Sequence, residues 1–173
     1  MRVWLLSFAN GRYTAAEQTA LRDLLTYHGF SIRISGAAGI RFKTGISLSA
    51  KAALQSAGGL DGFRLVEYGT LVMNQKNAAA YPFILGCEKV ASGRCYWIQD
   101  GIVQDKVFET VSGRQRFTSV LVDIPSSRYK TEYAFRGYII LQKGGQQYTL
   151  YGPPVARSIY YLAQRLIDRQ DYV

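Results

Sequence analysis

Short runs of hydrophobic residues, rich in β-branched and aromatic side chains, follow one another along most of the chain. Each run ends at Gly, Pro, Ser or Lys, which is typical of strands separated by turns. The main runs are Phe63–Met73, Gln115–Ile124, Glu132–Gln142 and Gln146–Tyr151, and shorter ones are Phe30–Ser35, Gly39–Ser47, Arg94–Gln104 and Val107–Val111. This pattern predicts a compact, mostly β domain.

Turn signals divide the runs further. Gly144–Gly145 and Asp100–Gly101 are two-residue sequences of the kind that close β-hairpins. Asn74–Gly86 lacks strand periodicity, and we expect it to form a surface loop.

Three segments show helical periodicity instead. They are Thr14–Tyr27, which is followed by Gly29, then Leu48–Ala57, which ends at Gly58–Gly59, and Val155–Arg169, which is opened by Pro153 and Pro154. The first and the last of these segments have apolar residues on one side, and the last should therefore pack on the sheet.

The predicted fold class is therefore α+β and β-rich. We expect an antiparallel β-sandwich-like domain, or one strongly bent sheet, with an N-terminal helix, a short helix near residue 50 and a C-terminal helix packed on the sheet. Residues 1–29 would form an extension of one strand and one helix, and residues 30–173 the main domain. Val3–Ala9 is interpreted as a strand because no small-x-small cleavage site of an export signal follows it.

Composition narrows the class of protein. The 173 residues are 48% hydrophobic and 19% charged, which indicates a globular chain, and the longest apolar runs are too short to span a membrane. The formal charge of +9 allows a nucleic acid, another polyanion or a membrane surface as partner. Lys and Arg are scattered along the chain, however, which favours a solvated basic surface over nucleic-acid binding.

The chain has two cysteines, Cys87 and Cys95, separated by a stretch that contains Gly93. In an exported protein they would form a disulfide across this loop, worth about 2–3 kcal/mol. In a cytosolic protein they would be two free thiols. They do not form a CxxC pair, and with a single histidine in the chain we expect no metal site.

Motifs for other chemistry are also missing from the sequence. It contains no glycine-rich phosphate loop and no acidic calcium loop, so we expect no cofactor. His28 is the single histidine, and its place before Gly29 predicts a helix-end or surface role rather than a catalytic one.

Glu67 is the most informative acidic residue. Strict alternation along its strand would place it on the same face as Phe63, Leu65 and Leu71, which should be buried. A buried carboxylate needs a cation or strong donors, and Arg41 and Arg136 lie in neighbouring strands. We therefore predict a structural ion pair of Glu67 with these arginines. The alternative is a general acid of a glycan hydrolase, with Glu132 or Asp123 as the second carboxylate.

Aromatic residues suggest a ligand site instead. Tyr81, Tyr96 and Trp97 lie close in sequence to the two cysteines, and Arg94 precedes Tyr96 and Trp97. Aromatic faces with polar edges stack on sugar rings, and Arg adds polar contacts. The alternative is that these rings fill the core of the sandwich.

A series of sequence motifs also resembles a known group of proteins. SIRIS–GIRFKTGIS, VEYGTLV, RFTSVLVDIP, YKTEYAFRGYIIL and TLYGPPVARSIYYLA follow in this order between Phe30 and Leu166. The series resembles an uncharacterised β-rich module of secreted and cell-surface proteins of Gram-positive gut Firmicutes, where it lies beside immunoglobulin-like, dockerin or carbohydrate-related domains. The resemblance implies an extracellular location and neighbouring domains in a longer chain, and it brings no catalytic residues.

Three functions follow from these observations. The leading one is a non-catalytic extracellular accessory or adhesion module that binds a glycan or a protein, or spaces other domains. The alternatives are a small glycan-active hydrolase that uses Glu67 and a basic domain that binds nucleic acid or another polyanion.

Overall fold

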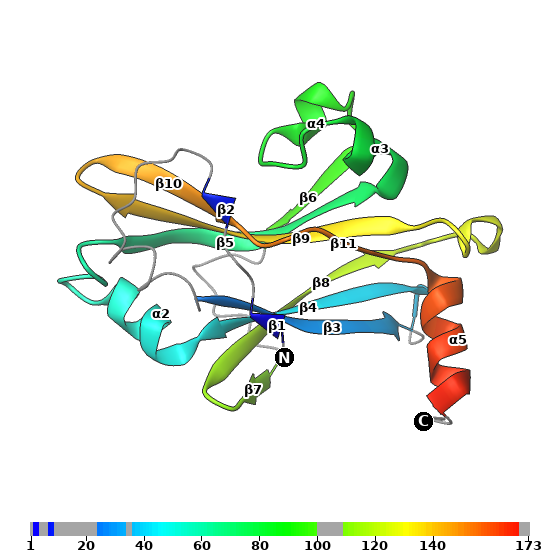
Figure 1. Ribbon diagram of the computed structural model, residues 1–173, viewed down its shortest axis with the longest axis horizontal. Helices are drawn as coiled ribbons and strands as arrows, with labels where there is room; N and C mark the ends of the chain where they lie inside the picture. The colour runs from blue at the N-terminus through cyan, green and yellow to red at the C-terminus, as the bar shows by residue number, and fades with distance from the viewer. Residues whose placement is uncertain (1, 4–6, 9–23, 34–35, 100–108, 170–173) are drawn as a thin grey trace.

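The computed structural model describes residues 2–3, 7–8, 24–33, 36–99 and 109–169, and of residues 2–3, 7–8 and 97–99 it describes only the backbone. Within these residues the strands form two antiparallel sheets that pack face to face (Figure 1). Short helices lie at the ends and on one outer face. The predicted fold class, an α+β and β-rich sandwich-like domain, is confirmed.

Each sheet combines strands from distant parts of the chain. Sheet 1 has the order β1 (Arg2–Val3), β3 (Leu25–Arg33), β4 (Gly39–Ser47), β8 (Arg114–Val122) and β7 (Glu109–Val111). Sheet 2 has the order β2 (Ser7–Phe8), β10 (Gln146–Tyr151), β9 (Tyr133–Lys143), β5 (Arg64–Asn74) and β6 (Cys95–Gln99), and β11 (Val155–Arg157) also pairs with β9. The first strands of the chain thus belong to both sheets.

The helices lie at the ends of the sandwich and on the outer face of sheet 2. They are α2 (Leu48–Gln55), α3 (Gln75–Ala80), α4 (Cys87–Val90), the 3-10 helix η2 (Ser126–Arg128) and α5 (Ile159–Arg169). Helices α2 and α5 lie at opposite ends of the sandwich, while α3 and α4 lie above the outer face of sheet 2 (Figure 1). In the described part of the chain, no helix has the length and apolar character needed to cross a membrane.

The main core lies between the two sheets. Phe42 of β4 stacks on Phe135 of β9, with 5.5 Å between the ring centroids, and both rings are fully buried. Further along, the rings of Tyr68 and Phe117 lie 4.8 Å apart. A separate hydrophobic cluster covers the outer face of sheet 2, where Leu71 and other residues pack beneath α3 and α4.

Several predictions from the pattern of residues are confirmed. Strand β4 covers Gly39–Ser47 as expected, with Ile40, Phe42 and Ile46 buried in the core. The hairpin at Gly144–Gly145 joins β9 to β10, and the short helix near residue 50 is α2. Ser47 caps α2 by accepting a hydrogen bond from the Ala50 backbone N–H.

Other predictions need correction. The end of the expected helix Thr14–Tyr27 is extended, because β3 begins at Leu25; residues 14–23 lie outside the described residues, as does the Asp100–Gly101 turn. The boundary expected after residue 29 falls inside β3, which pairs along its length with β4. The loop expected at Asn74–Gly86 contains α3. Val155–Arg157 forms β11, so the C-terminal helix begins only at Ile159.

Gly39 offers a direct test of the packing of β4 against β8. A Cβ atom at this position would collide with the backbone carbonyl oxygen of Leu121. We predict that Gly39→Ala lowers the free energy of unfolding by about 1–3 kcal/mol, because the backbone cannot yield without breaking the strand pairing. Gly58→Ala is the matched control, since its Cβ would meet no atom within 4 Å. Chemical denaturation that shows equal stability for both variants would contradict this packing.

Candidate functional site

A surface cavity of about 400 Å³ lies where the α3 segment meets the end of the sandwich. Its volume is within the range of small-ligand sites in proteins. The described residues that line it are Asn74, Asn77, Gly93, Arg94, Tyr96, Arg128, Thr131 and Tyr133. They come from the end of β5, from α3, from the start of β6 and from the η2 turn that leads into β9.

Pairing between strands explains why these residues meet. In sheet 2, Tyr133 of β9 is the partner of Asn74 of β5, and Tyr96 of β6 is the partner of Val72. Partners in neighbouring strands face the same side, so both tyrosines lie on the side of Val72. Tyr133 is buried against the core, whereas Tyr96 is 55% exposed. The cavity therefore has one ring in its wall and one ring open to solvent.

The segment between β5 and β6 supplies the upper wall of the cavity. Asn74 begins α3 by accepting a hydrogen bond from the Lys76 backbone N–H at 3.0 Å. The Gln75 backbone N–H donates to the carbonyl oxygen of Glu132 at 2.9 Å, which ties the start of α3 to the start of β9. This backbone hydrogen bond connects the two edges of the cavity.

A disulfide closes the same segment. Cys87 begins α4 and Cys95 begins β6, and the bond between them holds their Cα atoms 5.9 Å apart. Both cysteines are buried in the outer cluster of sheet 2, together with Phe83 and Ala91. Gly93 and Arg94, which line the cavity, lie inside the loop that the disulfide closes.

Arg136 anchors the segment from below. Its Nη1 donates to the carbonyl oxygen of Phe83 at 2.7 Å, and its Nε donates to that of Gly152 at 2.6 Å. Its guanidinium carbon lies 4.7 Å from the ring centroid of Tyr151. Burial lowers the pKa of Arg136 from its ordinary value. This arginine supplies donors to backbone carbonyls rather than to a carboxylate.

The residues expected at a ligand site have different outcomes. Arg94 and Tyr96 both line the cavity. Tyr81 does not: it ends α3 and packs against the outer cluster of sheet 2. Trp97 lies in β6 opposite Leu71, and its side chain falls outside the described residues.

Sequence reasoning missed the remaining lining residues. Asn74 and Asn77 were part of an expected loop, although their spacing of three residues suits the first turn of a helix. Arg128 was counted only as scattered charge. Thr131 and Tyr133 belong to a turn and a strand start whose position beside the end of β5 depends on tertiary pairing.

Charge distinguishes this cavity from an ordinary surface groove. Among its described lining residues, Arg94 and Arg128 are cationic and none is acidic. Both arginines are exposed, and two asparagines, Asn74 at the start of α3 and Asn77 within it, line the same cavity. The arrangement can accept hydrogen bonds from hydroxyl groups, donate to anionic oxygens and offer an aromatic face.

The predicted ion pair of Glu67 with Arg41 and Arg136 is wrong. A β-bulge between Leu65 and Glu67 shifts the alternation, so Glu67 lies on the outer face of sheet 2. There it accepts a hydrogen bond from the Tyr138 hydroxyl at 2.7 Å.

Neither arginine is placed to reach Glu67. Arg41 lies between the buried Ile40 and Phe42, so it faces the outer side of sheet 1, across the sandwich. Arg136 shares the outer face of sheet 2 but lies opposite Leu71, about 13 Å along the strand from Glu67. In the described part of the chain, the salt bridge that the structure forms joins Arg116 and Glu109.

The same placement separates the acids considered for a hydrolase. Glu132 adjoins Tyr133, whose partner Asn74 is seven residues from Glu67 along β5, which corresponds to about 24 Å. Glycosidases place their two carboxyl groups roughly 5–10 Å apart. Asp123 follows β8 in sheet 1 and is not on the face that carries Glu67. The positions of these residues therefore do not favour glycoside hydrolysis by a pair of carboxylates that includes Glu67.

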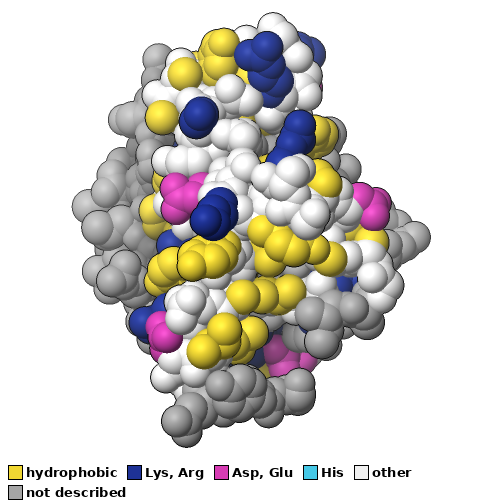
Figure 2. Space-filling model, turned by 90° about the vertical axis from the view of Figure 1, so that its right-hand side faces the viewer, with side chains coloured by type: hydrophobic (Ala, Val, Ile, Leu, Met, Phe, Trp, Pro, Cys, Tyr) yellow, Lys and Arg dark blue, Asp and Glu magenta, His cyan; other side chains and the backbone are white. Residues whose placement is uncertain are grey.

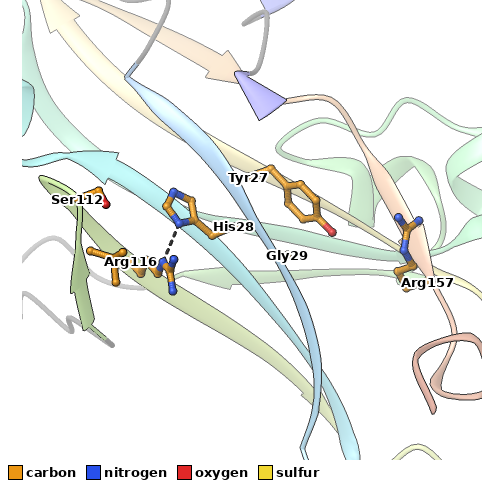
Figure 3. Close-up of a pocket in the computed structure, with 7 residues that line it drawn as sticks. Tyr27, His28, Gly29, Ser112, Arg116 and Arg157 are labelled. Carbon is orange, nitrogen blue, oxygen red and sulfur yellow. Dashed lines mark hydrogen bonds between the residues drawn. The ribbon is translucent and has the colours of Figure 1, made fainter. Parts of the chain in front are cut away.

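A second cavity, of about 570 Å³, opens beside β3 (Figure 3). The described residues that line it are Tyr27, His28, Gly29, Val111, Ser112, Arg116 and Arg157. His28 was expected at a helix end, but it occupies a β-bulge of β3 between Tyr27 and Gly29. Its ring lies over Gly45, where a Cβ atom would collide with it.

Hydrogen bonds fix the state of the His28 ring. Arg116 Nε donates to His28 Nδ1 at 2.7 Å (Figure 3). Because Nδ1 accepts, the proton of the neutral ring is on Nε2, which lies 2.7 Å from the Thr26 hydroxyl oxygen. The Thr26 hydroxyl in turn donates to the carbonyl oxygen of Gly45. Arg116 also pairs with Glu109 at 2.5 Å.

This environment disfavours a charged histidine. Burial, and then the positive charges of Arg116 and Arg114, lower the pKa of His28 from 6.5 to about 4, against the opposing effect of Glu109. Burial and Arg116 also lower the pKa of Lys43. The described residues contain no group of three or more His, Cys, Asp or Glu side chains suited to a metal ion.

Comparisons with known proteins add no family: no family model matches the chain, and neither a curated protein nor a solved structure is similar to it. The resemblance to the secreted Firmicutes module therefore stays a prediction.

We predict that the imidazole of His28 titrates with a pKa near 4. The folded state holds the ring neutral while the unfolded chain protonates it below pH 6.5, so stability falls as the pH drops from 6.5 to about 4. Because His28 is the single histidine, one proton NMR titration of its ring resonances measures this pKa directly. His28→Gln should remove the corresponding part of the pH dependence of unfolding. A titration midpoint near 6.5 would contradict the hydrogen-bond network.

The disulfide beside the first cavity gives a prediction about the stability of the protein. Replacing both cysteines by serine (Cys87→Ser with Cys95→Ser) should lower the free energy of unfolding by about 2–3 kcal/mol, because the unfolded chain gains the freedom of an open loop. Denaturation of the wild type with added dithiothreitol should show the same loss. The double variant is the control and should not respond to the reductant. A wild type that is equally stable with and without reductant would refute this role.

Proposed function

We propose that the chain is a non-catalytic extracellular binding module of a bacterial secreted or surface protein, and that the cavity beside α3 holds a glycan. The observation that carries the proposal is the composition of this cavity. It combines the exposed Tyr96 with the buried Tyr133, two asparagines and two arginines. Sugars offer the matching surfaces, an apolar ring face and a rim of hydroxyl groups.

The disulfide supports the extracellular part of the proposal. Disulfides persist in oxidising compartments and are rare in a reducing cytosol. Here the bond between Cys87 and Cys95 closes the loop that carries Arg94 and precedes Tyr96. A binding site pinned in this way suits a protein exposed outside the cell. The resemblance to modules of secreted Firmicutes proteins points in the same direction and implies neighbouring domains in a longer chain.

The cavity also suits binding better than bond cleavage. Its described lining residues include no carboxylate and no histidine, and so lack the usual general acids and bases. Glu67 lies on the outer face of sheet 2 and does not line this cavity. The proposed role therefore depends on contact surface and hydrogen bonding.

The test is a glycan array probed with the wild type, Tyr96→Ala and Asn77→Ala. We expect the wild type to bind a defined set of glycans and Tyr96→Ala to lose roughly tenfold in affinity, because a stacking ring contributes about 1 kcal/mol or more. Val90→Ala is the matched control, since Val90 is exposed on α4 and does not line the cavity.

Two results would overturn the proposal. One is a wild type that binds no glycan, which would leave the module as a spacer or a protein-binding domain. The other is glycan binding that survives both Tyr96→Ala and Asn77→Ala, which would place the site elsewhere.

A further inference from the structure

The cavity continues into a basic and aromatic surface at the end of the sandwich. Arg128, which lines the cavity, belongs to the η2 turn, and Lys130 follows it two residues later. The Lys130 ammonium lies 5.2 Å from the ring centroid of Tyr160 in α5. Figure 2 shows this end of the molecule, with Lys and Arg side chains above and among a group of hydrophobic side chains.

Helix α5 is fixed to the same turn. The Tyr160 backbone N–H donates to the carbonyl oxygen of Tyr129 at 2.9 Å, and the Tyr161 N–H donates to the Ser158 hydroxyl at 3.1 Å. Tyr160 and Tyr161 are nevertheless 54% and 44% exposed. Their backbone is held in place while part of each side chain remains open to solvent.

A second cation lies beside these rings. The Arg157 guanidinium carbon is 5.0 Å from the ring centroid of Tyr161 and 5.6 Å from that of Phe30. Cations and aromatic rings are therefore interspersed from the cavity across the turn to the first turn of α5. We call this set the end track; it comprises Arg94, Tyr96, Arg128, Lys130, Tyr160, Arg157 and Tyr161.

We propose that the ligand of the cavity is an acidic glycan chain, and that it extends along the end track beyond the cavity. This inference rests on the proposed glycan-binding function and adds the charge and the length of the ligand. Guanidinium groups bind carboxylates and sulfates by charge-assisted hydrogen bonds, and the exposed tyrosines offer faces to successive sugar rings. The asparagine amides of the cavity add partners for hydroxyl groups.

An acidic glycan suits this surface better than duplex nucleic acid. Duplex binding draws most of its affinity from phosphate contacts at close spacing along a continuous basic face. In the end track each cation is separated from the next by an aromatic ring or a polar turn. Sparse charges with interleaved rings match a chain that carries its acid groups on sugar rings, and the exposed Glu132 opposes any polyanion alike. Single-stranded nucleic acid also uses cations and stacking rings, so an oligonucleotide is included in the test.

The experiment uses a glycan array that carries uronate, sialylated and sulfated oligosaccharides beside neutral ones of the same lengths. Disaccharides and hexasaccharides of the acidic class that binds are then compared by calorimetry. We expect acidic glycans alone to be retained, a hexasaccharide to bind at least tenfold more tightly than a disaccharide, and binding to weaken as salt is added.

Variants separate the cavity from the rest of the end track. Lys130→Gln and Tyr160→Ala should weaken hexasaccharide binding about tenfold and leave the disaccharide unchanged, whereas Arg94→Gln should weaken both. Lys89→Gln is the matched control, because Lys89 is exposed on α4 outside the end track. Circular dichroism of each variant checks that it is folded.

The outcomes distinguish this inference from the proposed function. If neutral glycans bind as well as acidic ones, or if length has no effect, the glycan site stands and the acidic track is refuted. Equal or tighter binding of a single-stranded oligonucleotide of the same charge would assign the surface to nucleic acid. If no glycan of any kind binds, both the function and the track fail.

Discussion

Strand β9 runs through the middle of sheet 2 with hydrophobic side chains on both faces, so both faces of this sheet must be covered. Phe135, Ile139 and Leu141 face sheet 1, and Ala134 and Tyr138 face outward, all with their side chains fully buried. If sheet 2 packed only against sheet 1, its outer face would be in water and Ala134 and Tyr138 would not be buried. The segment between β5 and β6 supplies the missing cover.

That segment is too short to form a hydrophobic core of its own. It reaches stability by packing Phe83, Cys87 and Ala91 on the sheet, by the disulfide and by the hydrogen bond that Arg136 donates to the carbonyl oxygen of Phe83. Arg136 satisfies backbone groups that would otherwise be buried without partners. The cavity forms where this cover meets the η2 turn, and its position follows from the need to bury β9.

Elements that depend on residues close in the sequence were predicted correctly. The alternation in Gly39–Ser47 and the glycine pair at residues 144–145 specify a strand and a hairpin without help from distant residues. Leu25 fits the period of the expected helix, but its pairing with Ile46 of β4 places it in a strand.

The errors at Glu67 and at the cavity have a similar origin. One extra residue in a bulge moved Glu67 to the other face, and alternation alone contains no signal for such a bulge. Arg94 and Tyr96 could be found because they lie in one segment beside the cysteines. Arg128 and Tyr133 join them only through the order of strands β9, β5 and β6, which is a property of the whole sheet.

The cationic side chains of the protein lie in two kinds of environment: some are bound to groups within the fold, and others are accessible to a ligand. Arg136 is committed to carbonyl oxygens beneath the α3 segment, and Arg116 is committed to Glu109 and to the His28 ring. These cations stabilise the fold, and their charge is held away from solvent by burial or balanced by a carboxylate. Arg94, Arg128 and Lys130 are exposed; the two arginines share the cavity with asparagine amides and tyrosines, and Lys130 lies over the Tyr160 ring. The fold therefore brings accessible cations that are distant in the sequence together at the end of the sandwich that carries the cavity.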